Sequence, residues 1–326
     1  MDVSIIIVNY CSAKMVAECV ESIFEKTKGI DYEIIIVDND SRDNSEAFLK
    51  STLGDSTTLI SAGENLGFGK ANNLGAAYAK GEYLLLLNPD TLLVNNAIKV
   101  LYDYIKTHPE TGVVGGNLYS PEMKAVPSYC MQFDDLNTER EKASWKAILV
   151  GKISQRVAVG KEKRRFEEEF NYSEDIKKVA YIFGADMMMP KKLFESLGGF
   201  DPDFFMYAEE QELSWRVTAQ GYDVVSIPQA QIIHLEGATV KKQDEFSERQ
   251  FRMRMNGTLT YFKKRFGING AQEFYKIRSK RYKRLIQIAK WKGKDISVFV
   301  PALQQQCLRE VFQEFMKDNE REKVNV

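Results

Sequence analysis

Apolar runs of strand length alternate with helical patterns along the first 90 residues. Unbroken β-branched or leucine-rich runs predict buried strands, and the amphipathic stretches between them predict helices. We expect strands at 3–8, 32–37, 59–61 and 83–87, and helices at 13–28, at 45–53 and in a segment that ends near residue 80. Strands that alternate with helices predict an α/β fold with a mostly parallel sheet that helices cover on both faces.

The pattern changes after residue 120. Residues 120–178 are charged in their second half and predict a mobile or helical insertion. Further along, we expect order over 179–190, a helix at 209–220 and strands at 223–227 and 231–234. Beyond residue 240 the pattern is helical and basic. The sequence thus predicts a body of residues 1–240 and a helical C-terminal region of residues 241–326.

The composition is that of a folded globular protein. The chain has 326 residues, of which 44% are hydrophobic and 28% are charged. No run approaches the ~18 apolar residues of a membrane-spanning helix, and the first residues lack a signal-peptide pattern. Four cysteines (Cys11, Cys19, Cys130 and Cys307) form no CxxC pair, which argues against a disulfide framework and a zinc ribbon. These observations favour a reducing, cytoplasmic location.

The net charge of −1 conceals a strong asymmetry. Residues 241–294 contain 17 Lys and Arg against 4 Asp and Glu, a net of +13, whereas residues 1–240 carry a net of −12. Within 250–294, basic residues are interleaved with aromatic ones. Three interpretations stay open for this segment: solvated helices that pack apolar stripes on the body, peripheral attachment to anionic lipid headgroups and, least favoured, nucleic-acid binding.

Polar side chains collect where the predicted strands end. Asn9 follows the first strand, Asp38–Asp40 the second and Asn88–Asp90 the leucine-rich run. In open α/β sheets, ligands bind beyond the carboxyl ends of the strands, where a carboxylate is well placed to hold a hard divalent cation. Each segment also has a plain structural interpretation, because Asn, Pro and Asp form turns and Asp caps helices.

Three further features are candidates for binding or catalysis. The glycine-rich loop at 63–75 allows close approach to a diphosphate, but it is neither a GxGxxG fingerprint nor a Walker A motif, which disfavours a dinucleotide oxidoreductase and a P-loop NTPase. Glu209-Glu210, near a helix start, either supplies a general base or complements the helix dipole. His234 ends an apolar run, as a metal ligand or as a structural residue.

Six segments, in this order, resemble the family 2 glycosyltransferases, and among them the rhamnosyltransferase-like members. They are VSIIIVNY, IIIVDNDSRDNS, ENLGFGKANNLG, YLLLLNPD, FGADMMMPKKLFESLGGFDPDFFMYAEEQELSWR and IIHLEGAT, and they span about residues 3–240. The resemblance implies a GT-A fold: a mostly parallel, Rossmann-like sheet flanked by helices, here with a basic helical C-terminal extension. Residues 1–240 would form the catalytic domain, with 115–180 as a variable insertion on the acceptor side.

The resemblance also implies roles for individual residues. Asp90, in the family's variant of the Asp-x-Asp motif, and His234 would hold Mn²⁺ or Mg²⁺. The residues implied in nucleotide-sugar binding are Asn9, Tyr10, Asp38, Asp40, Asn65, Gly67, Asn72 and Asn88, with Asp38 reading the base and Asp40 near the ribose. Gly184 and Ala185 would lie below the acceptor.

By the same resemblance, the protein would transfer a hexose, with inversion, from dTDP-rhamnose or a UDP-sugar. The acceptor would be a hydroxyl of a glycan or glycolipid in cell-surface polysaccharide synthesis. The family usually has Glu-Asp at its catalytic pair, with the Asp as base. Here the pair is Glu209-Glu210, so Glu210 takes the position of the base. The alternative is a catalytically silent module that binds a sugar nucleotide. A cytoplasmic location is expected, peripheral on the inner face of the membrane if 250–294 binds lipid.

Overall fold

The computed structural model describes residues 1–154, 175–235, 246–291 and 295–324. Contacts within the chain divide it into two compact units. An α/β unit contains the described parts of 1–133, 165–205 and 209–241, and a helical unit contains those of 134–164, 206–208 and 242–326. Several stretches used above, among them KEKRRFEEEF and the end of IIHLEGAT, lie outside the described residues.

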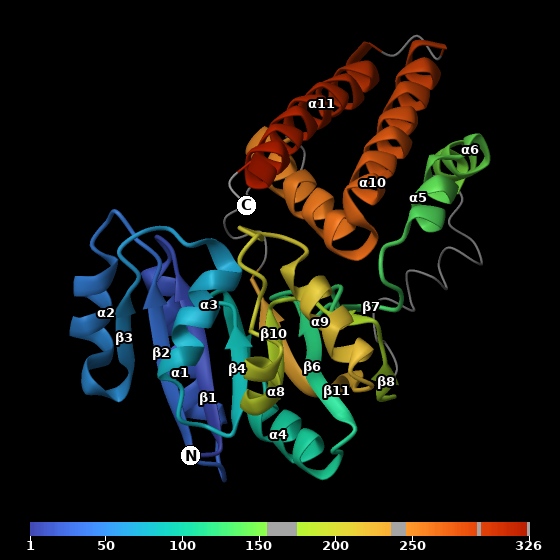
Figure 1. Ribbon diagram of the computed structural model, residues 1–326. Coiled ribbons are helices and arrows are strands. Elements are labelled where there is room, and N and C mark those ends of the chain that lie inside the picture. Colours follow the sequence, from blue (N-terminus) through green and yellow to red (C-terminus); the bar gives the residue numbers. More distant parts are fainter. Residues whose placement is uncertain (155–174, 236–245, 292–294, 325–326) are drawn as a thin grey trace. The chain divides into compact units, whose positions relative to one another are not determined.

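A nine-stranded sheet forms the centre of the α/β unit (Figure 1). Its main path runs in the order β3-β2-β1-β4-β10-β6-β11-β5, and β8 pairs with β11. The strands are β1 (Val3–Asn9), β2 (Tyr32–Asp38), β3 (Thr58–Ser61), β4 (Tyr83–Leu87), β5 (Thr91–Leu93), β6 (Thr111–Tyr119), β8 (Lys177–Lys178), β10 (Asp186–Pro190) and β11 (Asp223–His234). β7 (Tyr129–Cys130) and β9 (Tyr181–Ile182) form a separate two-stranded sheet.

The first four strands of this path are parallel, so their carboxyl ends meet at one edge. Asn9 at the end of β1 pairs in register with Asp38 at the end of β2. β10 then inserts antiparallel to β4, which places Asp186 opposite Leu87. β11 runs parallel to β6 but shifts its register between Ile227 and Gln231, the point where two separate strands are expected from the sequence. The sheet is therefore mixed in its second half, and the α/β class is confirmed.

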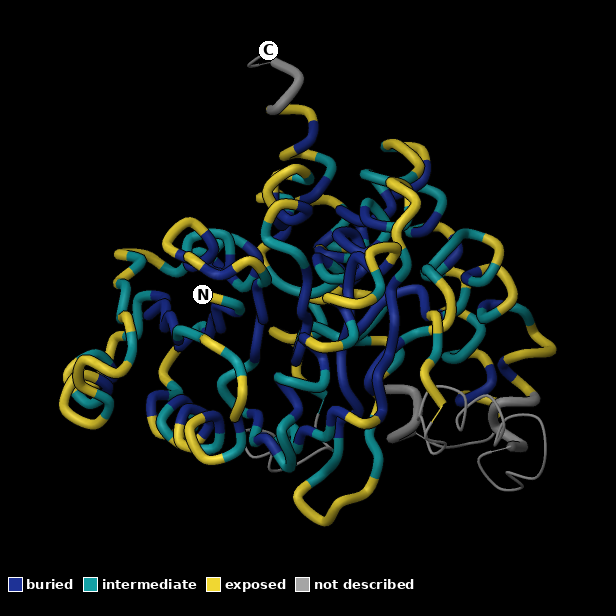
Figure 2. Tube along the Cα trace, turned by 90° about the horizontal axis from the view of Figure 1, so that it is seen from below, coloured by how far each residue is buried: buried dark blue, intermediate teal, exposed yellow. Residues whose placement is uncertain are grey.

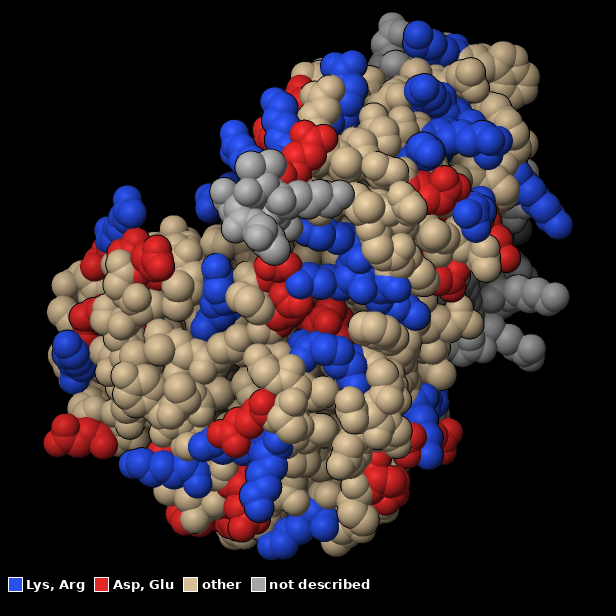
Figure 3. All heavy atoms as spheres, viewed as in Figure 1, with Lys and Arg blue, Asp and Glu red and all other residues tan. Residues whose placement is uncertain are grey.

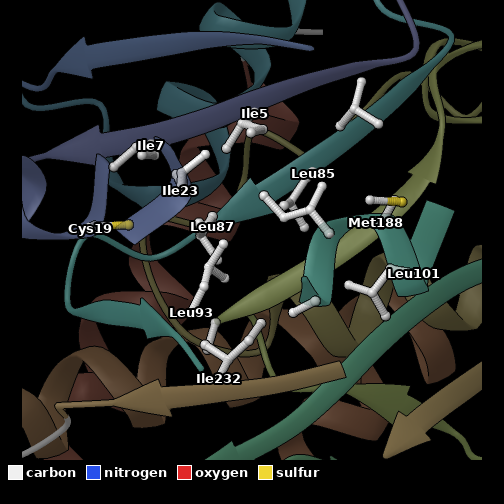
Figure 4. Close-up of a cluster of buried hydrophobic side chains, with 14 of the residues drawn as sticks. Ile5, Ile7, Cys19, Ile23, Leu85, Leu87, Leu93, Leu101, Met188 and Ile232 are labelled. Carbon is white, nitrogen blue, oxygen red and sulfur yellow. The ribbon is translucent and has the colours of Figure 1, made fainter. Parts of the chain in front are cut away.

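Helices cover both faces of the sheet because the apolar runs of its strands are unbroken and successive side chains point to opposite faces. They are α1 (Ala13–Lys26), α2 (Ser45–Leu53), α3 (Gly67–Tyr78), α4 (Ala97–Thr107), α8 (Lys191–Ser196) and α9 (Glu209–Ala219), with a 3-10 turn at Gly54–Ser56. One core cluster joins α1 and α4 to Ile5, Ile7 and Leu85 (Figure 4). The other joins α3, α8 and α9 to Ile6 and Leu86. Figure 2 shows the strands as the buried centre of this unit.

Among its described residues, the helical unit contains four helices: α5 (Leu136–Ala143), α6 (Trp145–Ser154), α10 (Glu248–Trp291) and α11 (Asp295–Val324). α10 is interrupted at Gly267, whose φ of 70° is not helical. A buried ion pair joins Arg278 of α10 to Glu139 of α5 at 2.7 Å, and the rings of Tyr275 and Phe312 stack between α10 and α11. Among the described residues, no helix is long and apolar enough to cross a membrane. The predicted helical C-terminal region is confirmed, and α5 and α6 join it from the segment 115–180.

Candidate functional site

The end of β1 is tied to the end of β2 by buried side chains. Asn9 donates from Nδ2 to Asp38 Oδ1 at 2.6 Å, and the second oxygen of Asp38 accepts from the Ser41 backbone at 3.0 Å. Asn9 is fully buried and Asp38 is 2% exposed, so both are held in place. Two other residues implied in nucleotide binding lie nearer to solvent. Tyr10 is 46% exposed, and Asp40, at a positive φ of 62°, pairs with Arg42.

Asn39 joins the end of β2 to the glycine-rich loop. Its Nδ2 donates to Asn65 Oδ1 at 3.1 Å and to the Gly67 carbonyl at 3.2 Å, and its Oδ1 accepts from the Leu66 amide at 2.8 Å. Asn65 in turn accepts from the Gly67 amide at 3.0 Å. Sequence reasoning assigned no role to Asn39, although it lies within the quoted DNDS segment. These bonds, which we call the Asn39 clamp, fix the loop between β3 and α3.

The first turn of α3 requires glycine. Gly67 has a φ of 77°, and a Cβ there would lie 2.0 Å from the carbonyl oxygen of Phe205, which accepts from the Phe68 amide. Asn72, on the same helix, is buried as deeply as Asn9 and Asp38. It is 1% exposed, and its Nδ2 donates to the Phe68 carbonyl at 3.0 Å. Asn72 therefore braces the helix from inside, while Asn65 and Gly67 form the loop itself.

Asp90 and His234, far apart in the sequence, meet where β5 pairs with β11. Thr91 is in register with His234, and the Leu235 amide donates to the Asp90 carbonyl at 2.8 Å. His234 Nε2 lies 3.3 Å from Asp90 Oδ1, and the two side chains are 12% and 21% exposed. A carboxylate and an imidazole that converge and reach the surface are a donor set that suits Mn²⁺ and is compatible with Mg²⁺. Among the described residues, no group of three His, Cys, Asp or Glu side chains is placed to hold a metal ion, so this pair is the donor set that the structure describes here.

The segment before β10 links this pair to the two glutamates. The Asn88 amide donates to the Ala185 carbonyl at 2.9 Å, and the Asn88 carbonyl accepts from Thr91 Oγ1. At Gly184, the residue before Ala185, a Cβ would lie 3.8 Å from Glu210 Cβ. The small residues at 184 and 185 thus bring the start of α9 close to the end of β4.

The two glutamates at the start of α9 differ in environment. Glu209 is 4% exposed, whereas Glu210 is only partly buried. Burial raises the pKa of Glu209 well above its ordinary value, and the negative charge of Glu210 raises it further. Both effects favour the protonated form of Glu209, and Glu210, the less buried of the two, is better placed to act as a base. Nearby, Glu212 holds Arg216 at 2.7 Å and has a structural role.

Sequence reasoning also missed Asp186, the first residue of β10. Its side chain is fully buried; Oδ2 accepts from the Gly116 amide at 2.5 Å, and Oδ1 has no hydrogen-bond partner among the described residues. Burial raises its pKa to about 8, against the lowering effects of the Gly116 amide and of nearby His234. No pattern marks this position, because the residue follows Gly184-Ala185 in an apolar segment. Asp186 is thus a neutral acid beneath the Asp90–His234 pair.

Fold and site together define a class of protein. The parallel strands end in a row of Asn and Asp side chains, a braced glycine-rich loop follows β3, and a carboxylate–imidazole pair and a glutamate pair converge nearby. This arrangement is that of a glycosyltransferase with a GT-A fold. The family model "Glycosyl transferase family 2" matches residues 4–198. The chain belongs to this family.

Comparisons with known proteins agree with this class. The "O-antigen biosynthesis protein RfbC" of Myxococcus xanthus is 26% identical over 233 residues, which cover 71% of this chain and 17% of that protein. An "N-acetylglucosaminyl-diphospho-decaprenol L-rhamnosyltransferase" of Mycobacterium tuberculosis is 26% identical over 212 residues, which cover 62% of this chain and 66% of that protein. The chain thus spans less than two thirds of either relative's length, and the predicted similarity to rhamnosyltransferases is confirmed.

A solved structure supports the GT-A fold. A mannosyltransferase from Pyrobaculum calidifontis, solved in complex with GDP-mannose and Mn²⁺, superposes with a TM-score of 0.57 at 16% identity. The match covers 96% of this chain and 87% of that one. At 16% identity, this similarity supports the fold alone.

Proposed function

We propose that the protein is an inverting, metal-dependent hexosyltransferase of cell-surface polysaccharide synthesis, with dTDP-rhamnose or a UDP-sugar as donor. The observation that carries the proposal is the 3.3 Å approach of Asp90 to His234 at the end of the sheet that also bears Asn9 and Asp38. The names of two relatives, an O-antigen biosynthesis protein and a rhamnosyltransferase that acts on a decaprenol-linked sugar, support the pathway and the donor.

In this proposal the residues at the strand ends hold the donor. Asn65, Gly67 and Asn72 border the nucleotide, and Asp38 reads the base. Asn9 and Tyr10 lie on the nucleotide-binding edge, Asp40 lies near the ribose, and Asn88 lies beside the diphosphate. Asp90 and His234 would hold Mn²⁺ or Mg²⁺, which neutralises charge on the leaving diphosphate. The mannosyltransferase of the same fold was solved with Mn²⁺.

Glu210 is the proposed base. An acceptor hydroxyl is a weak nucleophile, and a carboxylate that takes its proton during attack makes single displacement feasible. Because burial and the charge of Glu210 favour the protonated form of Glu209, Glu210 is the carboxylate that we assign to the acceptor. Gly184 and Ala185 lie below the acceptor in this proposal, and Gly184 is close to Glu210, whose Cβ would lie 3.8 Å from a Cβ built at residue 184.

The first experiment measures calorimetric binding of UDP, dTDP, GDP and NAD to the full chain, each with and without Mn²⁺. Binding of UDP or dTDP that requires the metal is the expected result. Asp90→Asn should lower the affinity for UDP or dTDP and abolish the increase in affinity that Mn²⁺ gives. Asp55→Asn, at an exposed position, should change neither the affinity nor its dependence on Mn²⁺. Nucleotide binding that ignores Mn²⁺ would remove Asp90 and His234 as ligands, and no binding at all would overturn the proposal.

Turnover separates the enzyme from its alternative, a silent sugar-nucleotide-binding module. The chain is incubated with dTDP-rhamnose or UDP-sugars and a polyprenyl-diphosphate-linked N-acetylglucosamine, an acceptor suggested by the name of the mycobacterial relative. Release of dTDP or UDP that depends on the acceptor supports transfer. Tight donor binding without turnover on any acceptor of a broad panel would support the silent module. A lipid-linked acceptor also implies peripheral membrane contact, which is one of the three interpretations that the sequence leaves open for residues 250–294.

A further inference from the structure

One face of the second half of α10 is a row of lysines. Lys276, Lys280, Lys283 and Lys290 are exposed, as is Gln287 between them. Their spacing of four, three, four and three residues places all five on one side of a helix. At 1.5 Å per residue the row is about 21 Å long. We call these five residues the lysine ridge.

The ridge carries uncompensated positive charge. The sequence from Lys276 to Trp291 contains no Asp or Glu. Among the residues that the structure describes, none of the ridge lysines forms an ion pair, whereas arginines of the same helix do. Figure 3 shows several Lys and Arg side chains on the face of the helical unit at the upper right. The exposed face of α11 differs, because Arg309 and Lys317 alternate there with Gln313 and Glu320.

The arginines between the ridge lysines are engaged inside the helical unit. Arg278 is 17% exposed and binds Glu139, and Arg284 donates to the Ala143 carbonyl with its guanidinium over the Trp145 ring. Arginine's planar fork is the usual choice for ordered phosphate and nucleic-acid recognition, whereas lysine is a mobile point charge on an apolar stem. A surface that presents only lysine therefore suits many loosely placed anions better than a fixed nucleic-acid backbone.

Exposed apolar side chains accompany this charge. Trp291, directly after the last ridge lysine, is 83% exposed. On α6, Trp145 and Leu149 are each 43% exposed and lie four residues apart on one helix face. Tryptophan is enriched at membrane interfaces, where its ring sits at the headgroup level. Basic side chains beside exposed tryptophans are the combination that binds an anionic bilayer surface.

We propose that the lysine ridge, with Trp291 at its end, is a peripheral contact surface for anionic lipid headgroups. The inference deepens the proposed function, because a lipid-linked acceptor gives the protein a reason to bind a membrane. The evidence for lipid binding comes from the residues of the lysine ridge. The region proposed to contact the membrane is thereby reduced from the basic segment 250–294 to one face of α10. The partner is the bilayer surface; nucleic acid is a competing outcome of the test.

The test is sedimentation of the full chain with vesicles of phosphatidylcholine alone or mixed with phosphatidylglycerol, without donor or acceptor. Wild-type protein is expected to sediment with the anionic vesicles only. The variant K280Q/K283Q should bind roughly 30-fold more weakly, because each lysine near an anionic surface contributes about 1 kcal/mol. The matched control R309Q/K317Q removes the same charge from the mixed face of α11 and should bind within about twofold of wild type.

W291A should weaken binding to the anionic vesicles while it leaves the net charge unchanged. Equal loss in K280Q/K283Q and R309Q/K317Q would show that general charge, and not the ridge, attracts the protein. Binding to single-stranded RNA without binding to anionic vesicles would assign the surface to nucleic acid. Either result overturns the proposal, and circular dichroism of each variant checks its fold. Because no substrate is present, failure here is distinct from failure of the proposed transfer.

Discussion

Single side chains decide the chemistry of the glutamate pair. Glu209 is buried, which raises its pKa and favours its protonated form, whereas Glu210 lies close to Gly184. Two adjacent glutamates in the sequence do not show which of them is ionised, because burial and mutual repulsion set that difference only in the fold.

Replacement of each glutamate by glutamine tests this assignment. Glu210→Gln should reduce transfer by at least about 100-fold, the usual contribution of a general base, with donor binding retained. Glu209→Gln should keep a much larger share of the activity, because an amide resembles the neutral acid that it replaces. Rates are measured as dTDP or UDP release under saturating donor. Equal losses in the two variants would contradict the assignment of Glu210 as the base.

Asp186 should make stability depend on pH. In the folded protein its pKa is about 8, against an ordinary value of 3.8. Between these two values the unfolded chain releases a proton that the folded chain retains, so this residue lowers the free energy of unfolding as pH rises, by up to about 1.4 kcal/mol per pH unit. Below pH 3.8 its contribution is fully present, and it is lost as pH rises through about 8.

Urea denaturation at several pH values measures this effect. Asp186→Asn should flatten the fall in stability between about pH 5 and about pH 8, because an amide does not titrate. Asp55→Asn, at an exposed position, should keep the wild-type slope. Parallel curves for wild type and Asp186→Asn would show that the buried carboxyl does not hold its proton.

The residues of the site were predictable where the sequence places them at strand ends. Asn9, Asp38, Asn88 and Asp90 follow buried runs, and the fold collects them as the pattern indicates. His234 meets Asp90 only through the antiparallel pairing of β5 with β11, which no local pattern signals. Asp186 escaped notice for the same reason, since its burial depends on Gly116 of a distant strand.

At the scale of elements, the boundaries of the early strands and helices agree with expectation. β4 and α2 begin and end at the predicted residues, because their apolar periods are unambiguous. The antiparallel insertion of β10 between β4 and β6 was not predictable, because the apolar sequence of a fully buried strand does not indicate whether the strand pairs parallel or antiparallel. The continuity of β11 was missed because its register shift lies at the gap between two apolar runs.

α10 contains a glycine whose replacement should disturb the segment just before α9. A Cβ at Gly257 would lie 2.2 Å from the carbonyl oxygen of Tyr207, and Tyr207 and Ala208 both have positive φ angles above 70°. Gly257→Ala should therefore lower the free energy of unfolding by about 1–3 kcal/mol, the usual effect of overpacking, although alanine favours helices. Tyr207 precedes Glu209 by two residues, so transfer should fall as well.

Thermal and urea denaturation measure the change. Asn269→Ala, at an exposed position of the same helix, is the control and should stay within about 0.5 kcal/mol of wild type. Wild-type stability in Gly257→Ala would show that the backbone of 206–208 yields to the added methyl group.

At the scale of the whole molecule, charge is divided between segments, although the chain is nearly neutral. Attraction to a membrane would therefore follow from the local field of the lysine ridge and not from net charge. Such a field is short-ranged: the Debye length falls from about 10 Å at 0.1 M salt to about 3 Å at 1 M.

The salt concentration should therefore distinguish binding to anionic vesicles from binding of a nucleotide. Raising NaCl from about 0.1 M to about 1 M should release the protein from anionic vesicles, whereas metal-dependent binding of UDP or dTDP should change far less, since its contacts are short and partly buried. The same buffers serve for sedimentation and calorimetry. Vesicle binding that persists at 1 M salt would point to insertion of apolar side chains in place of the lysines.

The Asn39 clamp has a consequence for the thermodynamics of donor binding. Residues 65–67 already have their hydrogen-bond partners without any nucleotide present, so they lose little conformational freedom when one arrives. Ordering a free loop costs about 1–2 kcal/mol per residue in backbone entropy. Here folding has already met that cost, and the binding entropy of a nucleotide should be correspondingly less unfavourable.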